Sequence, residues 1–256
     1  MKVDLEGRAA FVTGGTSGIG RAIVEHLVHA GMNVVFAGRD ADRGAAVAAS
    51  TQTAFIRADA TDRAESDEAF EQVLAFLGGR MDVFVANAAM VFAAPLGATP
   101  EPVFRELVEV NLTSTFRYSR ECFTVMRAQG SGSIVHIVSD AAIHGIHHIP
   151  AYSMTKAGVL ALSEVLAAEA VTHGVRVNAI CPGAVHPGVQ STPVGYEHHA
   201  EDASNWGPGP SGRHGTGADI AQAVLWLVSD QATHVSGATL RIDGAASSAM
   251  RAEARA

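Results

Sequence analysis

Tyr152 and Lys156 are the residues whose types and spacing point most directly to chemistry. They lie four residues apart in a segment with helical patterning, so their side chains share one face of the expected helix. A phenol with a pKa near 10 is a weak acid–base catalyst at neutral pH, and a nearby ammonium group lowers that pKa by stabilising the phenolate. The pair therefore fits a general acid/base that interconverts a carbonyl and an alcohol. Of the 18 basic residues, only Lys2 and Lys156 are lysines, which sets Lys156 further apart.

A glycine-rich segment, Thr13–Gly20, lies between an expected strand and an expected helix. Its glycines let the backbone come close to a pyrophosphate, and the start of the helix offers free N–H groups and a positive dipole end. Glycines alone are a weak signal, but the strand before them and the helix after them are typical of a dinucleotide site.

The spacing Gly14-xxx-Gly18-x-Gly20, with Ser139 and the segment Tyr152-Ser153-Met154-Thr155-Lys156, resembles the short-chain dehydrogenase/reductase family, in its single-domain type. Matches to this family run from about residue 5 to 245. The resemblance implies hydride transfer between a nicotinamide cofactor and a substrate carbon. Tyr152 would give or take the hydroxyl proton, Ser139 would hydrogen-bond the substrate oxygen, and Lys156 would also hold the nicotinamide ribose. Asn111 matches the fourth catalytic member, which would keep a water through which the proton leaves.

The end of the second expected strand bears on the choice of cofactor. An acidic residue there would hold the ribose 2′-OH of NAD, and in the family this Asp usually sits where Gly38 stands. With Gly38 at this position, no acidic side chain repels the 2′-phosphate of NADP, and Arg39 can form a bidentate ion pair with that phosphate. The sequence therefore favours NADP(H). Asp40, and Ser17 at a position often basic in NADP-dependent relatives, leave NAD(H) open.

Three more segments extend the resemblance. Asp59-Ala60 stands where family members hold the adenine, and Asn178–Gly183 matches the segment that passes the nicotinamide. Asn87-Ala88-Ala89 is an imperfect copy of the motif Asn-Asn-Ala-Gly, with Ala86 and Ala89 as the departures. The expected cofactor-binding residues are Gly14, Thr16, Ser17, Gly18, Ile19, Gly20, Arg39, Asp59, Ala60, Asn87, Ala88, Tyr152, Lys156, Pro182, Gly183 and Val185.

The substrate side is marked by histidines and by a departure from the family. Pro187 takes the place of a Thr that often contacts the cofactor, and Thr192 is the alternative. The expected substrate contacts are Ala141, His144, His147, Ala184, His186 and Trp206, whereas His198 and His199 are expected to be exposed. No metal site is expected, because Cys and acidic partners are not near these histidines.

Alternating strand and helix patterns must position these residues. Strands are expected near 9–13, 33–37, 53–57, 82–86, 133–139, 175–180 and 239–242, and helices near 19–30, 41–50, 62–77, 101–128, 152–173 and 218–229. This order predicts an α/β, Rossmann-like, doubly wound parallel sheet of about seven strands, as a single domain over 1–256. The run at about 186–217, rich in Pro and Gly, breaks the pattern and is predicted to form a substrate lid.

Composition narrows the function classes. The net charge of −8 and the absence of Arg or Lys clusters argue against nucleic acid, and no stretch of roughly 20 apolar residues predicts a membrane span. Two cysteines, Cys122 and Cys181, and an N-terminus without a signal-peptide core favour a cytoplasmic protein. The expected partner is a small-molecule carbonyl or alcohol, in a homotetramer or homodimer built on helices 101–128 and 152–173. The alternatives are a 3-oxoacyl-carrier-protein reductase, an NAD-dependent secondary-alcohol or sugar dehydrogenase, and a non-catalytic nucleotide-sensing regulator.

Overall fold

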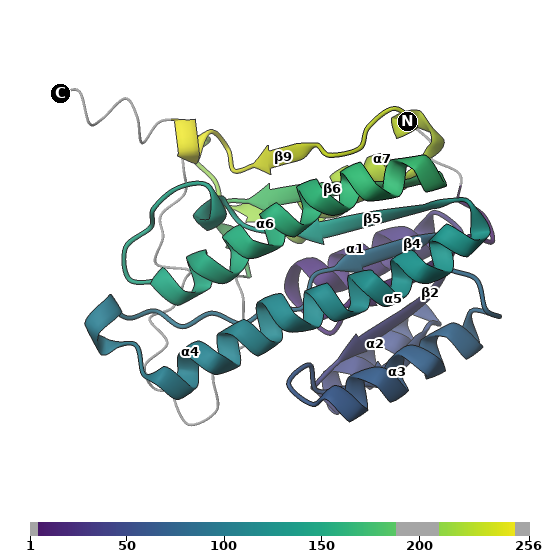
Figure 1. Cartoon of the computed structure of the whole chain (residues 1–256), viewed down its shortest axis with the longest axis horizontal. Helices are drawn as coiled ribbons and strands as arrows, with labels where there is room; N and C mark the ends of the chain where they lie inside the picture. Colours follow the sequence, from purple (N-terminus) through teal and green to yellow (C-terminus); the bar gives the residue numbers. More distant parts are fainter. Residues whose placement is uncertain (1–4, 188–209, 249–256) are drawn as a thin grey trace.

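A seven-stranded parallel sheet forms the centre of the molecule, whose computed structural model describes residues 5–187 and 210–248 (Figure 1). The strand order is β3-β2-β1-β4-β5-β6-β9. The strands are β1 (Ala9–Thr13), β2 (Asn33–Gly38), β3 (Ala54–Arg57), β4 (Val83–Ala86), β5 (Gly132–Ile137), β6 (Val175–Pro182) and β9 (Thr239–Ile242). This confirms the predicted fold class, a doubly wound Rossmann-like domain, since every strand pair in the sheet is parallel.

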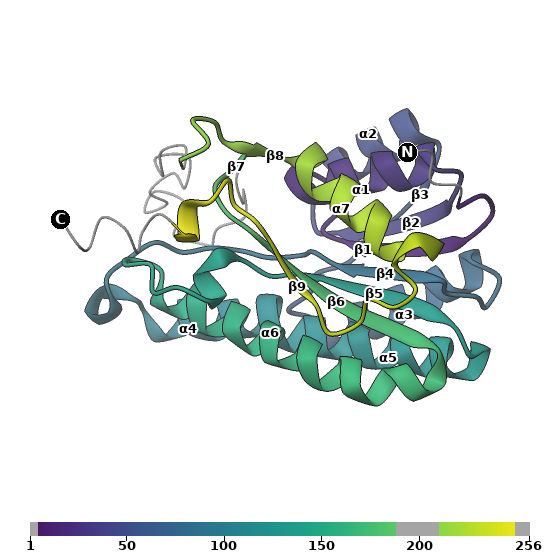
Figure 2. The ribbon, with the colours of Figure 1, turned by 90° about the horizontal axis from the view of Figure 1, so that it is seen from above.

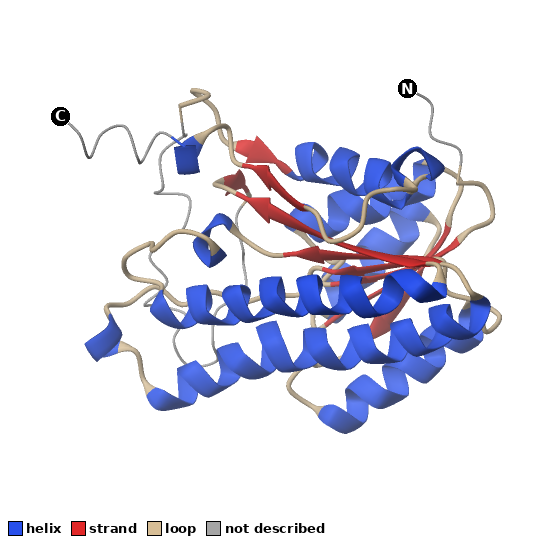
Figure 3. Cartoon of the chain, turned by 45° about the horizontal axis from the view of Figure 1, so that its top comes forward, coloured by secondary structure: helices blue, strands red, loops and turns tan. Residues whose placement is uncertain are grey.

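Helices cover both faces of the sheet (Figures 2 and 3). One face carries α1 (Gly18–His29), α2 (Ala41–Thr51) and α7 (Gly217–Val228). The other carries α3 (Arg63–Phe76), α4 (Glu101–Leu107), α5 (Ser114–Gln129) and α6 (Pro150–Ala170). Short 3-10 turns are η1 (Leu96–Ala98), η3 (Asp140–Ala142), η4 (Val171–His173) and η7 (Asp230–Ala232).

Side-chain alternation along the strands builds a separate core on each face. Ala10 and Val12 of β1 pack in the cluster that includes Ile23 of α1 and Val224 of α7. Phe11, between them, points to the opposite cluster, where its ring stacks on Phe84 at 5.5 Å between centroids. All five residues of β1 are buried, as expected for a parallel strand with helices on both sides.

The point where the strand order reverses positions the site. From β1 the chain moves to β2 and β3 on one side, then returns to β4 on the other side of β1. In open α/β sheets the crevice outside the carboxyl ends of the strands at such a switch point is where ligands bind. Thr13, at the end of β1, and the residues after Ala86 of β4 therefore mark the expected crevice.

The structure corrects two expectations. The helix predicted over 101–128 is interrupted at Val108–Thr113 by η2, a π-helical turn that contains Asn111. The irregular run predicted over 186–217 ends earlier, because β8 (Gly215–Thr216) pairs with β7 (Val185–His186) and α7 starts at Gly217. Residues 188–209 of that run lie outside the described residues, so the lid itself stays a prediction.

Candidate active site

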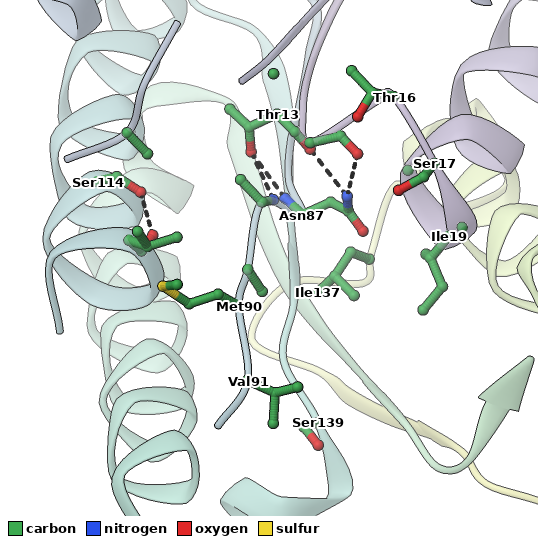
Figure 4. Close-up of a pocket in the computed structure, with 18 of the residues that line it drawn as sticks. Thr13, Thr16, Ser17, Ile19, Asn87, Met90, Val91, Ser114, Ile137 and Ser139 are labelled. Atoms are coloured by element: carbon green, nitrogen blue, oxygen red, sulfur yellow. Dashed lines mark hydrogen bonds between the residues drawn. The ribbon is translucent and has the colours of Figure 1, made fainter. Parts of the chain in front are cut away.

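A cavity of about 400 Å³ opens at the carboxyl ends of the strands (Figure 4). Its wall contains every residue that the sequence marks for the cofactor, from the loop after β1 to Val185. Three of the four expected catalytic residues, Ser139, Tyr152 and Lys156, line the same cavity. The fold therefore brings the phosphate loop and the Tyr–Lys pair to one space.

The loop between β1 and α1 is braced against the residues that follow β4. The backbone N–H groups of Asn87 and Ala88 donate to Thr13 Oγ1 at 3.0 and 3.1 Å, and Asn87 Nδ2 donates to the carbonyls of Thr13 and Gly14, both at 3.1 Å (Figure 4). Gly14 has φ +69°, and a Cβ there would lie 2.7 Å from Ala88 Cα. Only glycine fits this close approach without strain.

The first turn of α1 is left open to a ligand. Ser17 is its N-cap residue, yet its side chain makes no capping hydrogen bond. The orphan N–H groups of a helix start need a partner, and an anion is favoured there by the helix dipole. The uncapped turn and the glycine cradle beside it fit the pyrophosphate of a dinucleotide.

Arg39 lies at the other end of the cavity, directly after β2. It is exposed, lines the cavity and makes no ion pair within the described parts of the chain. Asp40 is occupied instead: as N-cap of α2 it accepts from the Arg43 backbone N–H at 2.9 Å and from Arg43 Nε at 2.6 Å. These hydrogen bonds hold the pKa of Asp40 below its ordinary value.

Asp59 lies across this end of the cavity, after β3. Its Oδ1 accepts from the backbone N–H and the hydroxyl of Thr61 at 2.9 and 2.8 Å. The carboxylate is thus held at the rim by its own loop, next to Ala60.

Tyr152 and Lys156 lie in the first two turns of α6, against the end of β5. Tyr152 is 7% and Lys156 3% exposed. Lys156 Nζ donates to the carbonyl of Ile137 at 2.8 Å and lies 5.8 Å from the centroid of the Tyr152 ring. Pro150, at the start of the helix, suits a first turn whose backbone N–H groups have no helical partner.

Burial governs the proton affinities of this pair. It raises the pKa of the Tyr152 phenol well above its ordinary value, the Ser139 side chain lowers it, and Asp140 and Cys181 raise it further. Burial also lowers the pKa of Lys156 to about 8. From the sequence, Lys156 is expected to lower the pKa of Tyr152; in the structure, desolvation of the buried phenol outweighs that effect.

Ser139 follows β5 and is 8% exposed. Its Oγ accepts from the backbone N–H of Ala141 at 3.1 Å, which caps η3, and donates to Asp140 Oδ1 at 3.1 Å. The hydroxyl is thereby fixed at the cavity wall beside Tyr152.

Asn111 is not among the described residues that line the cavity. It is fully buried in the π turn η2, behind the loop that follows β4. Its Oδ1 accepts from the Met90 N–H at 2.8 Å, and its Nδ2 donates to the Met90 carbonyl at 3.0 Å and to Thr155 Oγ1 at 3.1 Å. Through these contacts it ties the cavity wall to α6.

Of the residues expected to contact the substrate, few line the cavity. Ala184 lines the cavity, whereas Ala141, His144, His147 and His186 are not among the described residues that do, so their substrate role stays a prediction. Trp206, Thr192, His198 and His199 lie outside the described residues. Over the described ranges 5–187 and 210–248, no group of three His, Cys, Asp or Glu side chains is arranged to hold a metal ion.

Other wall residues carry no sequence signal strong enough to single them out. Met90, Val91 and Val138 are apolar residues from the loops after β4 and β5. Asp140 also lines the cavity, and its position directly after Ser139 is the signal that could have identified it. No helix among the described residues combines the length and apolar character needed to cross a membrane.

The chain is similar to known proteins over nearly its whole length. Residues 14–246 match the family model described as enoyl-(acyl carrier protein) reductase. The chain is 37% identical over 245 residues to 2,5-dichloro-2,5-cyclohexadiene-1,4-diol dehydrogenase of Sphingobium indicum, covering 94% of this chain and 97% of the relative. It is 30% identical over 261 residues to the 3-oxoacyl-(acyl-carrier-protein) reductase of Aquifex aeolicus, covering 95% and 99%. A crystal structure of an actinorhodin polyketide ketoreductase variant with NADPH superposes with a TM-score of 0.84 at 26% identity, covering 93% and 97%.

Proposed function

The chain belongs to the short-chain dehydrogenase/reductase family of oxidoreductases, and from that premise we propose that it transfers a hydride between NADP(H) and a ketone or secondary alcohol. One observation carries the proposal: Ser139, Tyr152 and Lys156 line the same cavity as the phosphate loop. An acid/base pair beside an anion-binding helix N-terminus fits a site in which a dinucleotide cofactor and a substrate meet.

The residues around the cavity fit a dinucleotide. Gly14, Gly18 and Gly20 with the open turn of α1 would hold the pyrophosphate, Asp59 and Ala60 would border the adenine, and Lys156 would hold the nicotinamide ribose. The bound cofactor supplies or accepts the hydride, and in its oxidised form it brings a positive charge.

Tyr152 is the proposed general acid/base. In reduction its hydroxyl donates a proton to the substrate oxygen, and in oxidation the phenolate accepts the alcohol proton. Burial favours the protonated phenol, so the Lys156 ammonium is needed close by to stabilise the phenolate when it forms. Ser139 holds the substrate oxygen beside the Tyr152 hydroxyl, and Asn111 supports the wall through Met90.

Preference for NADP(H) rests on Arg39. Asp40 is committed to the start of α2 and to Arg43, whereas Arg39 lines the cavity without an ion pair among the described residues and has the capacity to bind a 2′-phosphate. Gly38 adds no acidic side chain, and a Cβ there would lie 2.6 Å from Thr16 Cγ2.

Reduction of an acyl chain on a carrier protein is the second candidate, because a relative at 30% identity carries that name. Its substrate would be presented by an acidic carrier, for which a basic docking surface is needed. The net charge of −8 argues against it, and a small-molecule substrate is favoured.

We also propose that the chain forms a homotetramer or homodimer through α5 and α6. Apolar side chains on these helices are largely exposed: Phe116 at 50%, Met154 at 60% and Val165 at 58%. Light scattering that finds only monomers at micromolar concentration would remove this proposal.

The function is tested by a screen of NADPH and NADH oxidation with ketones, β-ketoesters, sugars and steroids, and by the reverse reactions with the alcohols. The screen includes cyclohexanone and cyclohexanol. Tyr152→Phe keeps the aromatic ring and removes the hydroxyl group that exchanges a proton with the substrate, so turnover is expected to fall by about 10²–10⁴-fold. Calorimetry should show that the variant still binds NADPH. Unchanged turnover in Tyr152→Phe, or no reaction with any pair, refutes the proposal.

A further inference from the structure

Tyr118 on α5 is a residue of the cavity wall that the proposed mechanism does not use. Val110, Ser114 and Tyr118 follow one another at a spacing of four along η2 and α5, and all three line the cavity. Asp59 and Ala60, which are proposed to border the adenine, line the same cavity from the turn after β3. The contacts of Tyr118 connect these two parts of the wall.

The hydroxyl of Tyr118 reaches the first turn of α3. Burial raises the pKa of Tyr118, and a hydrogen bond with the Ser66 side chain lowers it. Ser66 is 1% exposed, and its hydroxyl donates to the Asp62 carbonyl at 2.8 Å and lies 3.4 Å from the Asp59 carbonyl. Because the Ser66 proton is directed to these carbonyls, its oxygen accepts from Tyr118.

The turn formed by residues 59–62 carries the carboxylate that would meet the adenine. Glu65 Oε2 in the first turn of α3 accepts from the Asp59 N–H at 2.9 Å. Thr61 donates two hydrogen bonds to one carboxylate oxygen of Asp59, Oδ1, so Oδ2 is the oxygen that can accept from a base. The turn is therefore held by α3 on one side and, through the hydroxyl pair described above, by α5 on the other.

We propose that Tyr118 is a positioning residue for the base of the cofactor: through Ser66 it holds the turn where the Asp59 carboxylate can accept a hydrogen bond from the 6-amino group of adenine. An ionised carboxylate only accepts hydrogen bonds, and the 6-amino group is a donor, whereas hypoxanthine has a carbonyl oxygen at this position. The inference rests on the dinucleotide part of the proposed function and deepens it by naming what fixes the choice of base.

The test compares two dinucleotides that differ only in the base. NADP⁺ and its hypoxanthine analogue are titrated into the enzyme by calorimetry, without substrate and so without turnover. The NAD⁺ pair replaces them if the wild type binds NAD⁺ more tightly. In the wild type the analogue should bind about tenfold or more weakly, because a hydrogen bond to a charged group is lost.

Tyr118→Phe removes the hydroxyl and keeps the ring that packs on Phe11 and Phe84, with centroids 5.5 and 6.5 Å away. The turn then loses its link to α5, so the ratio of the two dissociation constants should fall by about threefold to tenfold. The loss should fall on the adenine cofactor, since the hypoxanthine analogue makes no such hydrogen bond in the wild type.

Two further variants make the result specific. Ser66→Ala removes the middle of the link and should lower the ratio as Tyr118→Phe does, and the double variant should go no further, because the two hydroxyls act as one path. Thr124→Val removes an exposed hydroxyl of the same helix, which bonds to the Arg120 carbonyl at 2.8 Å, and its ratio should match the wild type.

Two outcomes overturn the inference. One is a wild type that binds the hypoxanthine analogue as tightly as the adenine cofactor. The other is an unchanged ratio in Tyr118→Phe, with both constants moved by the same factor, as a purely structural role of the hydroxyl requires. Failure of the proposed function looks different: no dinucleotide binds, which overturns both, or dinucleotides bind and no carbonyl–alcohol pair reacts.

Discussion

The side-chain amide of Asn111 pairs with both backbone groups of one residue, Met90, accepting from its N–H at 2.8 Å and donating to its carbonyl at 3.0 Å. A residue on a neighbouring β-strand would make the same two backbone hydrogen bonds. The Asn111 side chain therefore takes the place of a strand partner for the loop after β4. That loop carries Met90 and Val91 into the cavity wall.

Asn111→Leu should therefore destabilise the protein and impair catalysis. It leaves the buried N–H and carbonyl of Met90 without partners, at about 1–3 kcal/mol for each group. Urea unfolding followed by fluorescence measures the loss. Asn111→Asp keeps the acceptor and should lose less; equal stability of all three proteins would contradict the assigned role.

Gly20→Ala should weaken cofactor binding. A Cβ at Gly20 would overlap the carbonyl oxygen of Gly14 and the Asn87 amide, which are the groups that hold the phosphate loop in place. Displacing them is expected to raise the dissociation constant of NADPH at least tenfold, measured by calorimetry. Gly97→Ala is the control, since a Cβ there meets nothing within 4 Å and should leave the constant unchanged.

Arg39→Gln tests the cofactor preference. Loss of a charge-assisted hydrogen bond, about 1.5–3 kcal/mol, should raise the KM for NADPH by about 10–100-fold and leave the KM for NADH nearly unchanged. Arg57→Gln removes an exposed arginine from β3 that pairs with Glu65 at 3.2 Å, and serves as the charge control. Equal use of both cofactors by the wild type would disprove the preference.

His136 on β5 is a buried neutral histidine between two helices. Its Nε2 lies 2.9 Å from Ser119 Oγ of α5, and its Nδ1 lies 2.7 Å from Ser163 Oγ of α6. Because the Ser163 hydroxyl donates to the Val159 carbonyl, its oxygen accepts from His136 Nδ1. Burial, with Lys156 nearby, lowers the pKa of His136 to about 3.

This depressed pKa predicts acid sensitivity. Between pH 6.5 and about 3 the unfolded state binds a proton that the folded state does not, so stability falls as the pH falls through this window. The loss attributable to His136 approaches about 1.4 kcal/mol per pH unit. Urea unfolding at pH 7, 6, 5 and 4 should show a shallower dependence in His136→Asn than in the wild type. His234→Asn, on the surface, should keep the wild-type slope.

The central strands β1, β2, β4, β5 and β6 were predictable from the sequence because burial on both faces requires mostly apolar residues along each strand. Predicted strand ends differ from the observed ones by no more than two residues, as at 133–139 against Gly132–Ile137. The residues marked for the cofactor all line the cavity: most of them lie at or after the ends of strands that meet at one edge of the sheet, and Tyr152 and Lys156 lie in the first two turns of α6.

The π turn at Val108–Thr113 could not be predicted in the same way. This turn contains Asn111, whose side chain bonds to Met90, 21 residues away in the chain. The spacing of apolar residues along a helix carries information about near neighbours in the sequence and none about such a distant contact. The histidines assigned to the substrate missed the described wall for a related reason: loop conformation, not strand position, decides where they point. His186, for example, is held in β7, with its ring 6.4 Å from that of His214.

The hydrogen bonds between Thr13, Gly14 and Asn87 have a calorimetric consequence. They order the phosphate loop during folding, before any ligand arrives, so little conformational entropy is left to lose when a dinucleotide binds. The heat-capacity change of binding should then reflect the apolar surface that the ligand covers, without the larger negative contribution of a segment that folds around it.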